Sequence, residues 1–310
     1  MMTILIIGLG SIAKKHIAAL KSLDFNLNIY ALRSGSEAAE WEDVKSIYSL
    51  DDLPSLIDFA IVSNPTNLHG QYIDCLAERK IPLFIEKPPL AELWSSEQLK
   101  MKVIDNGIMT YVACNLRFHP CIAFLKQFVS ENSDWRVNEV NIYCGSYLPD
   151  WRPGLDFKNV YSANAEMGGG VHLDLFHELD YTHWIFGRPA SVRCVKSSKS
   201  SLNISAVDYA NYILNYIDFT ANVVLNYFRK DPKRNIEILF ENETWNVDLL
   251  KNVIFSSTGK TIFSADDDFV VGDTYKAQME YFIDCLANNQ VPMNTFTESL
   301  ETLKTCLSDE

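Results

Sequence analysis

A glycine-containing turn near the start of the chain is the first segment whose residue types and spacing indicate chemistry. It consists of Gly8, Leu9, Gly10, Ser11, Ile12 and Ala13. The first glycine permits a tight turn, the second lets the backbone approach a pyrophosphate, and the small sixth residue lets helix and strand pack closely. The phosphates then lie at a helix N-terminus, which favours anions. We therefore predict a dinucleotide site here; the alternative is a glycine-bearing turn without a ligand.

The end of the second predicted strand indicates which dinucleotide fits. A site that prefers NAD carries Asp or Glu there, to hold the ribose hydroxyls. In this chain Arg33 and Ser34 follow the strand, and a guanidinium with a hydroxyl suits a 2′-phosphate. We therefore expect NADP(H) to be favoured over NAD(H). In the alternative, Arg33 is a solvated surface charge and Glu37 or a backbone group meets the ribose.

The elements that position this turn predict a doubly wound α/β fold. Short apolar runs alternate with amphipathic stretches from Ile4 to Val112, as in βαβ units that build a parallel sheet. Beyond Pro120 longer alternating runs follow one another, which indicates an antiparallel sheet. We predict a dinucleotide-binding Rossmann domain at residues 1–118. Residues 119–310 are predicted to form an α+β domain with a large, mainly antiparallel open-faced sheet, for substrate binding and dimerisation.

The expected elements can be stated by residue range. In the first domain we expect strands at Ile4–Ile7, Asn28–Leu32, Phe59–Val62, Leu83–Ile85 and Met109–Ala113, and helices at Ala13–Leu23, Leu68–Arg79 and Glu92–Asp105. In the second we expect strands at Val137–Tyr147, Ser191–Lys196, Asp208–Ile217 and Ala221–Phe228, and helical stretches at Ile122–Val129, within Gly168–Phe186, at Tyr275–Ala287 and at Glu298–Leu307.

Composition bounds the class of protein. The chain has 310 residues, 47% of them hydrophobic and 22% charged, which is typical of a globular protein with two domains. Its formal net charge of -13 argues against a nucleic-acid or anionic-membrane partner. No apolar run reaches the ~18 residues of a membrane span. The seven scattered cysteines indicate buried thiols in a reducing compartment, so we expect a cytoplasmic protein without a metal site.

Four further segments, in this order, resemble the Gfo/Idh/MocA family of oxidoreductases, which includes glucose-fructose oxidoreductase and inositol dehydrogenase. They are Ser63–His69, Glu86–Pro88, Asn115–Pro120 and Gly168–Tyr181. The first is similar to a turn that lies along the cofactor, the second to the signature tripeptide, and the third to the entry into the second domain. The resemblance implies that the cofactor contacts include Ser63, Asn64, Pro65, Asn67, His69, Glu86, Lys87 and Asn115.

The fourth segment resembles the family's Gly-Gly-Gly-x-x-x-Asp…His-x-x-Asp helix, and the resemblance implies that Lys87, Asp174 and His177 are catalytic. Oxidation of a secondary alcohol requires removal of its hydroxyl proton, and His177 is the expected acceptor. Lys87, at the carboxyl end of a strand, is expected to stabilise charge on the reacting oxygen. Asp174, one helical turn earlier, is expected to orient substrate or imidazole.

The family pattern also leaves alternatives open. Asp174 and His177 are three positions apart where many relatives have four, and His172 on the same helix is a possible substitute. Glu86 and Lys87 are alternatively a surface ion pair. His177 is alternatively a core-edge histidine satisfied by Asp180 or Tyr181, with Glu178 and Asp180 supporting the site or solvated. Asn64 and His69 are alternatively parts of a turn and helix cap.

A loop rich in aromatic and basic residues follows the predicted strand Val137–Tyr147. Trp151, Arg152 and Tyr161 are candidate substrate contacts, because aromatic faces stack on sugar rings and Arg pairs with carboxylate or phosphate. Arg117 is a further candidate, together with the three catalytic residues. The loop is similar to a subset of the family associated with bacterial surface sugars such as nonulosonic acids. The alternative is a well-packed structural loop.

These observations lead to an NAD(P)-dependent oxidoreductase that moves a hydride between nicotinamide and a secondary alcohol or ketone of a sugar or sugar derivative. One alternative is a sugar epimerase or hydrolase that uses transient oxidation with a retained cofactor. A second is a non-enzymatic NADP-sensing regulator, which has no need of a proton-transfer pair. Relatives commonly pair subunits through the second-domain sheet, so the resemblance implies a homodimer or homotetramer.

Overall fold

The computed structural model describes residues 1–23, 25–35 and 41–309. The chain forms two compact units: unit 1 is Met1–Asn115 with Val270–Leu303, and unit 2 is Leu116–Phe269 with Lys304–Glu310. The predicted domain boundary after residue 118 stays a prediction. The units add a feature that this prediction lacks, because a late segment of the chain returns to the first unit.

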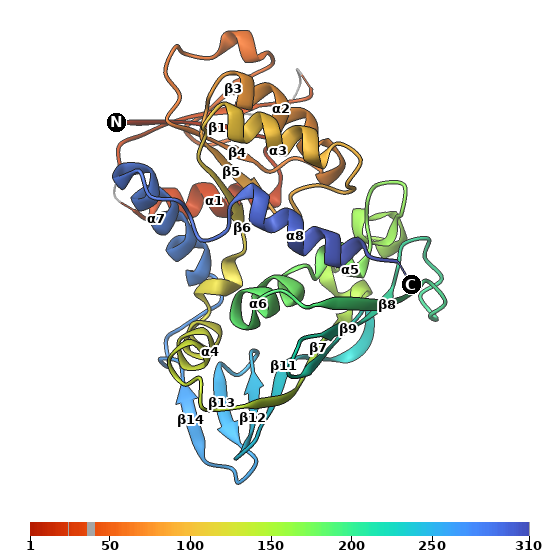
Figure 1. Cartoon of the computed structure of the whole chain (residues 1–310). Helices are drawn as coiled ribbons and strands as arrows, with labels where there is room; N and C mark the ends of the chain where they lie inside the picture. The colour runs from red at the N-terminus through yellow and green to blue at the C-terminus, as the bar shows by residue number, and fades with distance from the viewer. Residues whose placement is uncertain (24, 36–40, 310) are drawn as a thin grey trace. The chain divides into compact units, whose positions relative to one another are not determined.

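Unit 1 is built on a six-stranded parallel sheet (Figure 1). Its strands are β1 (Met2–Ile7), β2 (Leu27–Leu32), β3 (Val44–Ile47), β4 (Phe59–Val62), β5 (Leu83–Glu86) and β6 (Thr110–Ala113). The spatial order is β3-β2-β1-β4-β5-β6, so the direction of winding reverses between β1 and β4. Every residue of β4, β5 and β6 is buried, as expected for strands covered on both faces. Ligands of such sheets bind at the carboxyl edge, at the reversal point.

Helices cover both faces of this sheet. They are α1 (Ser11–Lys21), α2 (His69–Glu78), α3 (Ser96–Asp105), α7 (Asp273–Asn288) and α8 (Phe296–Leu307), the last as far as Leu303. In α1 the buried residues Ala13, His16, Ile17 and Leu20 recur at three- and four-residue spacing, which gives it one apolar face. α7 lies beside α1, and its Phe282 ring contacts the rings of three core aromatics, Phe59, Phe84 and Tyr111.

Unit 2 is built on an eight-stranded sheet. Its strands are β7 (Val137–Tyr147), β8 (Ser191–Ser197), β9 (Tyr209–Asn215), β10 (Thr220–Asn226), β11 (Phe228–Phe240), β12 (Thr244–Asp248), β13 (Val253–Ser256) and β14 (Thr261–Ser264). Their order is β14-β13-β12-β11-β7-β10-β9-β8. All neighbours are antiparallel except β7 and β10, which run parallel. The prediction of a mainly antiparallel sheet is therefore confirmed, with this one exception.

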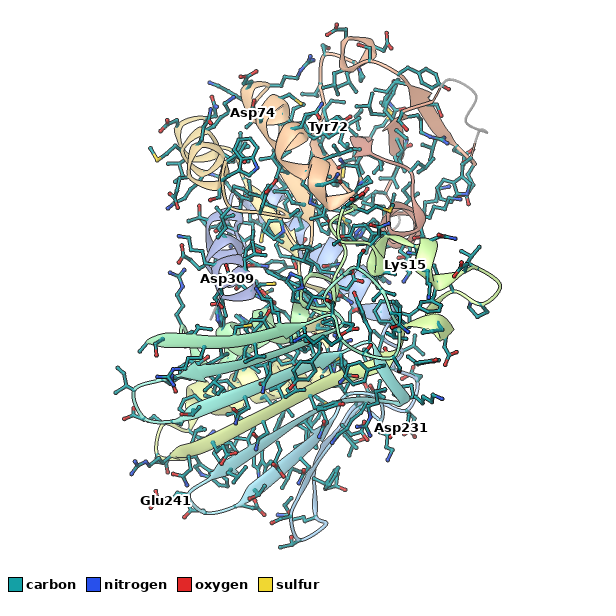
Figure 2. The ribbon with its side chains drawn as sticks, turned by 90° about the vertical axis from the view of Figure 1, so that its right-hand side faces the viewer. Lys15, Tyr72, Asp74, Asp231, Glu241 and Asp309 are labelled. Carbon is teal, nitrogen blue, oxygen red and sulfur yellow. The ribbon has the colours of Figure 1, made fainter. Side chains whose placement is uncertain are left out.

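The helices of unit 2 are α4 (Pro120–Glu131), α5 (Val171–Asp174) and α6 (His177–Phe186); α4 packs against β14 and α6, and α5 packs against β9 and β10. Buried residues alternate along β7, β9 and β10, and the residues between them are partly exposed on the opposite face. Asp231 within β11 and Glu241 just beyond it mark the two ends of that long strand in Figure 2. No helix in the described ranges is long and apolar enough to cross a membrane.

The helical stretch predicted within Gly168–Phe186 is interrupted. α5 ends at Asp174, Leu175 leaves helical geometry at φ -96°, ψ 35°, and α6 begins at His177. Glu178 and Asp180 lie in the first turn of α6, where acidic residues favour a helix start. The expectation that Asp174 and His177 share one continuous helix is therefore wrong.

Two buried ion pairs hold α6 in unit 2. The Arg117 guanidinium donates two hydrogen bonds to Asp180, at 2.9 and 2.8 Å, and both side chains are 1% exposed. Arg234 Nε donates to Glu178 Oε1 at 2.6 Å, and the Glu178 side chain is 0% exposed. The alternative that Glu178 and Asp180 are solvated is therefore wrong.

We expect Asp180→Asn to lower the free energy of unfolding by about 3–5 kcal/mol, because it leaves the Arg117 guanidinium buried without its counter-charge. Chemical denaturation of both proteins measures the difference. Asp51→Asn is the matched control, since the Asp51 side chain is 88% exposed beside Arg79 and its loss should change little. Equal effects of the two substitutions would contradict the importance of the buried pair.

His172 in α5 is 8% exposed, and burial, with the charge of Lys196 as a smaller cause, lowers its pKa from 6.5 to about 4. Between pH 4 and 6.5 the unfolded chain therefore binds a proton at His172 that the folded chain does not bind. We expect this residue to remove on the order of 3 kcal/mol of stability as the pH falls from 6.5 to 4. His172→Leu should flatten that part of the stability–pH profile, and an unchanged slope would contradict the assignment.

Candidate functional site

The glycine turn of unit 1 lies where the winding of the sheet reverses. Gly8 follows β1 with a positive φ of 81°, and a Cβ there would fall 2.9 Å from the Asn64 Cα, which follows β4. Only glycine therefore lets the two strand ends approach. Gly10 caps α1 without a side-chain hydrogen bond, and the space around a Cβ added there is open. The exposed N-terminus of α1 suits an anionic group.

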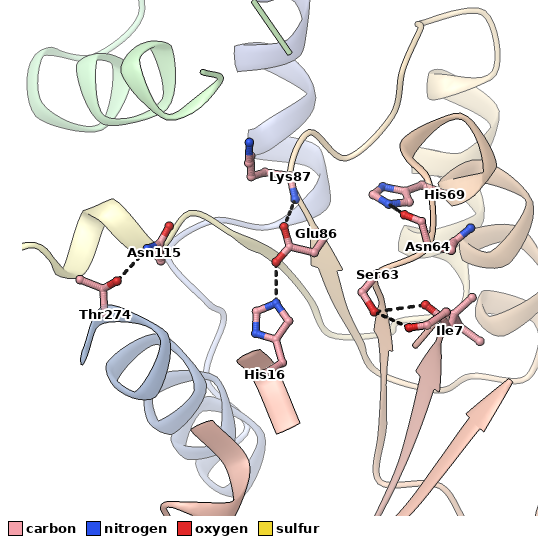
Figure 3. A network of polar contacts seen from close by, with 10 residues as sticks. Ile7, His16, Ser63, Asn64, His69, Glu86, Lys87, Asn115 and Thr274 are labelled. Carbon is pink, nitrogen blue, oxygen red and sulfur yellow. Dashed lines mark hydrogen bonds and ion pairs between the residues drawn. The ribbon is translucent and has the colours of Figure 1, made fainter. Parts of the chain in front are cut away.

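The residues after β4 are arranged around this turn (Figure 3). Ser63 donates its hydroxyl to Ile7 O at 3.1 Å and Gly8 O at 3.2 Å, which ties β4 to the turn. Asn64 Oδ1 and Nδ2 are shielded from solvent and have no hydrogen-bond partner within the described residues. A buried amide without partners is rare in a folded chain. Together with the open helix N-terminus, it fits a polar ligand such as a dinucleotide.

His69 begins α2 and is 1% exposed. Its Nε2 lies 3.0 Å from Asn64 O and its Nδ1 3.3 Å from Pro89 O, so the ring lies between two loops. Burial lowers the pKa of His69, and a neutral ring donates its one N–H to only one of these two carbonyl oxygens. The N-terminus of α2 carries no side-chain cap, so the helix-cap alternative for this segment is wrong. Pro65 and Asn67 lie on the exposed side of the same turn.

Arg33 and Ser34 follow β2, as predicted. The Arg33 side chain is half-buried, and its Nη1 donates to Ser46 Oγ on β3 at 3.4 Å. Ser34 is exposed. The guanidinium is thus oriented by the neighbouring strand. Glu37, the alternative ribose contact, lies outside the described residues.

Glu86 and Lys87 stand at the carboxyl end of β5. Glu86 is 8% exposed; its Oε1 contacts His16 Nε2 at 2.5 Å, and its Oε2 accepts from the Lys87 backbone N–H at 3.1 Å. The Lys87 ammonium points away from this carboxylate (Figure 3). The arrangement is therefore not the surface ion pair that the sequence left open. The nearby Asn115 is 6% exposed and donates to Thr274 Oγ1 of α7 at 2.7 Å.

In unit 2, the predicted catalytic residue Asp174 is hydrogen-bonded to Tyr227. Tyr227, between β10 and β11, donates its hydroxyl to Asp174 Oδ2 at 2.5 Å and is 0% exposed. Burial, and then the charge of Asp174, raises the pKa of Tyr227 well above its ordinary value, so the phenol stays a donor. His177 begins α6 and is partly exposed, while His172 is buried and less suited to meet a substrate.

The predicted substrate contacts of unit 2 have different surroundings. Trp151 is 38% exposed, packs edge-on against the Tyr227 ring at 5.3 Å and donates Nε1 to Ser146 Oγ at 2.8 Å. Tyr161 donates its hydroxyl to Gly168 O at 2.7 Å, and Arg152 is exposed. Arg117 is enclosed with Asp180 and Trp184. Trp151 packs on Tyr227, the partner of Asp174, and thus lies near Asp174. Arg117 instead forms a buried ion pair with Asp180.

Steric crowding explains why the segment that begins at Gly168 is rich in glycine. A Cβ added to Gly169 would fall 2.1 Å from Tyr161 O, so only glycine fits between the loop and α5. Among the described residues, no group of three or more His, Cys, Asp or Glu side chains is placed to hold a metal ion.

Four contributors were missed by the sequence reasoning: His16, Ser46, Thr274 and Tyr227. Their partners lie 13 to 159 positions away along the chain and belong to other elements, so residue spacing carries no signal of them. His16 alone offered a hint, because a histidine on the apolar face of α1 requires a buried partner.

Comparison with known families gives two matches that together cover more than half of the chain. Residues 2–113 match the model of the oxidoreductase family with an NAD-binding Rossmann fold, Gfo/Idh/MocA. Residues 124–245 match a Gfo/Idh/MocA C-terminal domain. The matches fall on the predicted nucleotide domain and on the part of the chain that contains β7 to β11.

Curated relatives are distant. The NAD(+)-dependent scyllo-inositol 2-dehydrogenase of Bacillus subtilis is 23% identical over 253 residues, which cover 77% of this chain and 70% of that protein. The NADP(+)-dependent scyllo-inositol 2-dehydrogenase of the same organism is 25% identical over 190 residues, covering 61% of this chain and 51% of that protein. The chain thus spans only about half the length of the second relative.

Solved structures share the fold. The WlbA dehydrogenase from Bordetella pertussis, in complex with NADH and UDP-GlcNAcA, has a TM-score of 0.81 at 17% identity and covers 97% of this chain and 92% of its own. Levoglucosan dehydrogenase, in complex with NADH and levoglucosan, has a TM-score of 0.83 at 16% identity, with 98% and 95% covered. At such identities the likeness establishes fold alone. With both family models matched in order and the reversal-point turn in place, the chain belongs to the Gfo/Idh/MocA family of oxidoreductases.

Proposed function

We propose that this protein is an NADP(H)-preferring dehydrogenase or ketone reductase acting on a secondary alcohol or ketone of a sugar or sugar derivative. The observation that carries the proposal is the turn at Gly8 and Gly10, where two strand ends approach beside the partnerless Asn64 amide. Gly8, Gly10, Ser11, Ile12 and Ala13 would hold the pyrophosphate at the N-terminus of α1. Asn64 would donate or accept one of the cofactor's hydrogen bonds.

The bound nicotinamide supplies the hydride acceptor or donor. His177 would take the hydroxyl proton on oxidation and return it on reduction, as a residue whose ordinary pKa lies near neutrality. Lys87 would hydrogen-bond the reacting oxygen and stabilise developing charge there. Asp174, held by Tyr227, would orient the substrate or the imidazole. These roles rest on the family pattern and on the local surroundings of each residue.

The preference for NADP(H) is supported by Arg33. Its guanidinium is half-buried beside Ser46, so it is held near the end of β2 and is not a freely solvated charge. Ser34 adds an exposed hydroxyl next to it. A planar guanidinium in this place suits a phosphate on the ribose.

The substrate class is supported by the names of relatives, which include inositol and levoglucosan dehydrogenases. One structural neighbour holds UDP-GlcNAcA and another is named UDP-N-acetylglucosamine 3-dehydrogenase, so a nucleotide-linked sugar, such as a precursor of a bacterial surface sugar, is the finer proposal. Trp151, packed on Tyr227 and partly exposed, would offer an aromatic face to a sugar ring. Arg152 would meet an acidic group.

A second candidate is sugar hydration or isomerisation by transient oxidation with a retained cofactor. A relative 22% identical over 148 residues is named 2,7-anhydro-N-acetylneuraminate hydratase. Turnover of substrate without a net change in cofactor absorbance would favour this candidate over the dehydrogenase.

The proposal includes a cytoplasmic homodimer or homotetramer that pairs through the second sheet. The seven cysteines, all within the described residues, are thiols outside any disulfide, which suits a reducing compartment. The residues between the buried positions of β7, β9 and β10 are partly exposed, and hydrogen bonds link several of them, such as Asn222 Nδ2 to Asn141 Oδ1 at 3.1 Å. This ordered polar face suits contact with a second copy.

The cofactor assignment is tested by fluorescence titration with NADPH and NADH. We expect tighter binding of NADPH, and we expect Arg33→Asp to raise the Kd for NADPH by about tenfold or more while changing that for NADH less. Arg79→Asp is the matched control, because it makes the same charge change beside an exposed partner, Asp51. No binding of either cofactor would remove the basis of the proposed function.

The catalytic roles are tested with a panel of inositols, anhydrosugars and UDP-amino sugars while cofactor absorbance is monitored. We expect Lys87→Ala and His177→Ala each to lower kcat by about 10²- to 10⁴-fold, because each removes proton transfer or charge stabilisation at the reacting oxygen. Lys251→Ala, whose side chain is 79% exposed, serves as control. Full turnover by either catalytic variant would overturn its assigned role.

A further inference from the structure

A buried polar bridge links the helix of the glycine turn to the strand that ends at Lys87. His16 lies in α1 and is 0% exposed, and its Nε2 contacts Glu86 Oε1 at 2.5 Å. The other carboxylate oxygen accepts from the Lys87 backbone N–H at 3.1 Å. The Glu86 carboxylate at the end of β5 therefore binds two separate groups, the His16 ring of α1 and the Lys87 backbone N–H (Figure 3).

The His16 ring is packed so that only one of its nitrogens has a polar partner among the described residues. Its Nδ1 is buried and has no hydrogen-bond partner within the described part of the chain, and its ring packs against Phe84 and Tyr275. Nε2, which contacts Glu86, is therefore the ring nitrogen through which His16 makes its polar contact.

The charge of Glu86 is consistent with this arrangement. Burial alone raises the pKa of this carboxyl, but the hydrogen bond from His16 and the neighbouring charges outweigh burial and hold the pKa below its ordinary value. Glu86 thus remains an acceptor for both partners. A charged acceptor makes each hydrogen bond stronger than a neutral one would be.

We propose that His16 is a positioning residue that, through Glu86, fixes the backbone of Lys87 and so the direction in which the lysine side chain leaves β5. The inference rests on the proposed catalytic role of Lys87. His16 belongs to α1, so the same bridge holds the lysine in register with the helix whose N-terminus would bind the pyrophosphate. Misplacement of a reacting group by about 1 Å can cost about 10²-fold in rate.

The role of His16 is tested with three variants. His16→Leu removes the donor; His16→Gln keeps an N–H close to the place of Nε2; Ile17→Val removes one buried methylene from the same helix without touching Glu86. We expect His16→Leu to lower kcat by about 10-fold or more with an unchanged Kd for NADPH, since only the reaction step is affected. His16→Gln should recover most of the rate, and Ile17→Val should match the wild type.

A spectroscopic readout needs no substrate. The amide proton of Lys87, assigned in protein labelled with ¹⁵N only at lysine by its loss in Lys87→Arg, should shift in His16→Leu and return toward its original position in His16→Gln. An amide signal that does not shift in His16→Leu overturns the inference. A drop in kcat that Ile17→Val reproduces also overturns it. Failure of the wild type to bind cofactor or convert any sugar instead overturns the proposed function, whatever the amide signal does.

Discussion

The approach of β1 to β4 at their carboxyl ends is the constraint on which the arrangement of unit 1 depends. Gly8 has no side chain, so the backbone after β1 can lie against Asn64, and Ser63 closes the gap by donating to Ile7 and Gly8. α1 starts immediately beyond this contact and therefore points its N-terminus along the same edge. A side chain at position 8 would separate the strand ends and tilt the helix with them.

Residues with a proposed role in each unit are held by buried hydrogen-bond partners. Lys87 is held at its backbone by Glu86, and Asp174 is held at its carboxylate by Tyr227. In both cases the partner is nearly inaccessible to solvent, so water does not compete for the hydrogen bond. Such support costs desolvation, and the ion pair of Arg117 with Asp180 shows the same reliance on buried polar contacts.

Local pattern was sufficient for much of the fold. β7 has the predicted bounds, because buried and partly exposed residues alternate along its middle, and the glycine turn has the predicted context of strand and helix. β3, Val44–Ile47, was missed because two polar residues separate its two apolar ones, whereas β4, a strand of the same length, is apolar throughout. β11 was missed because its first half is charged. The break between α5 and α6 was missed because the residue spacing across both segments is compatible with one continuous helix.

The site could be predicted only in part, for a physical reason. Motifs report residues that are near one another in the chain, such as Glu86 and Lys87. The contacts that support them join residues 70 and 53 positions apart, from His16 to Glu86 and from Asp174 to Tyr227. These pairings follow from how the elements pack, and a single sequence does not record that packing.

The late segment Val270–Leu303 has a consequence for the order in which the parts of the protein fold during synthesis. It completes unit 1: Phe282 fills the core beside Phe59 and Phe84, and Val112 N–H donates to Asn294 O at 2.8 Å along the outer side of β6. Domains usually fold as they leave the ribosome, the N-terminal one first. Here unit 1 is completed only by Val270–Leu303, so it remains unfinished while β7 to β14 are synthesised.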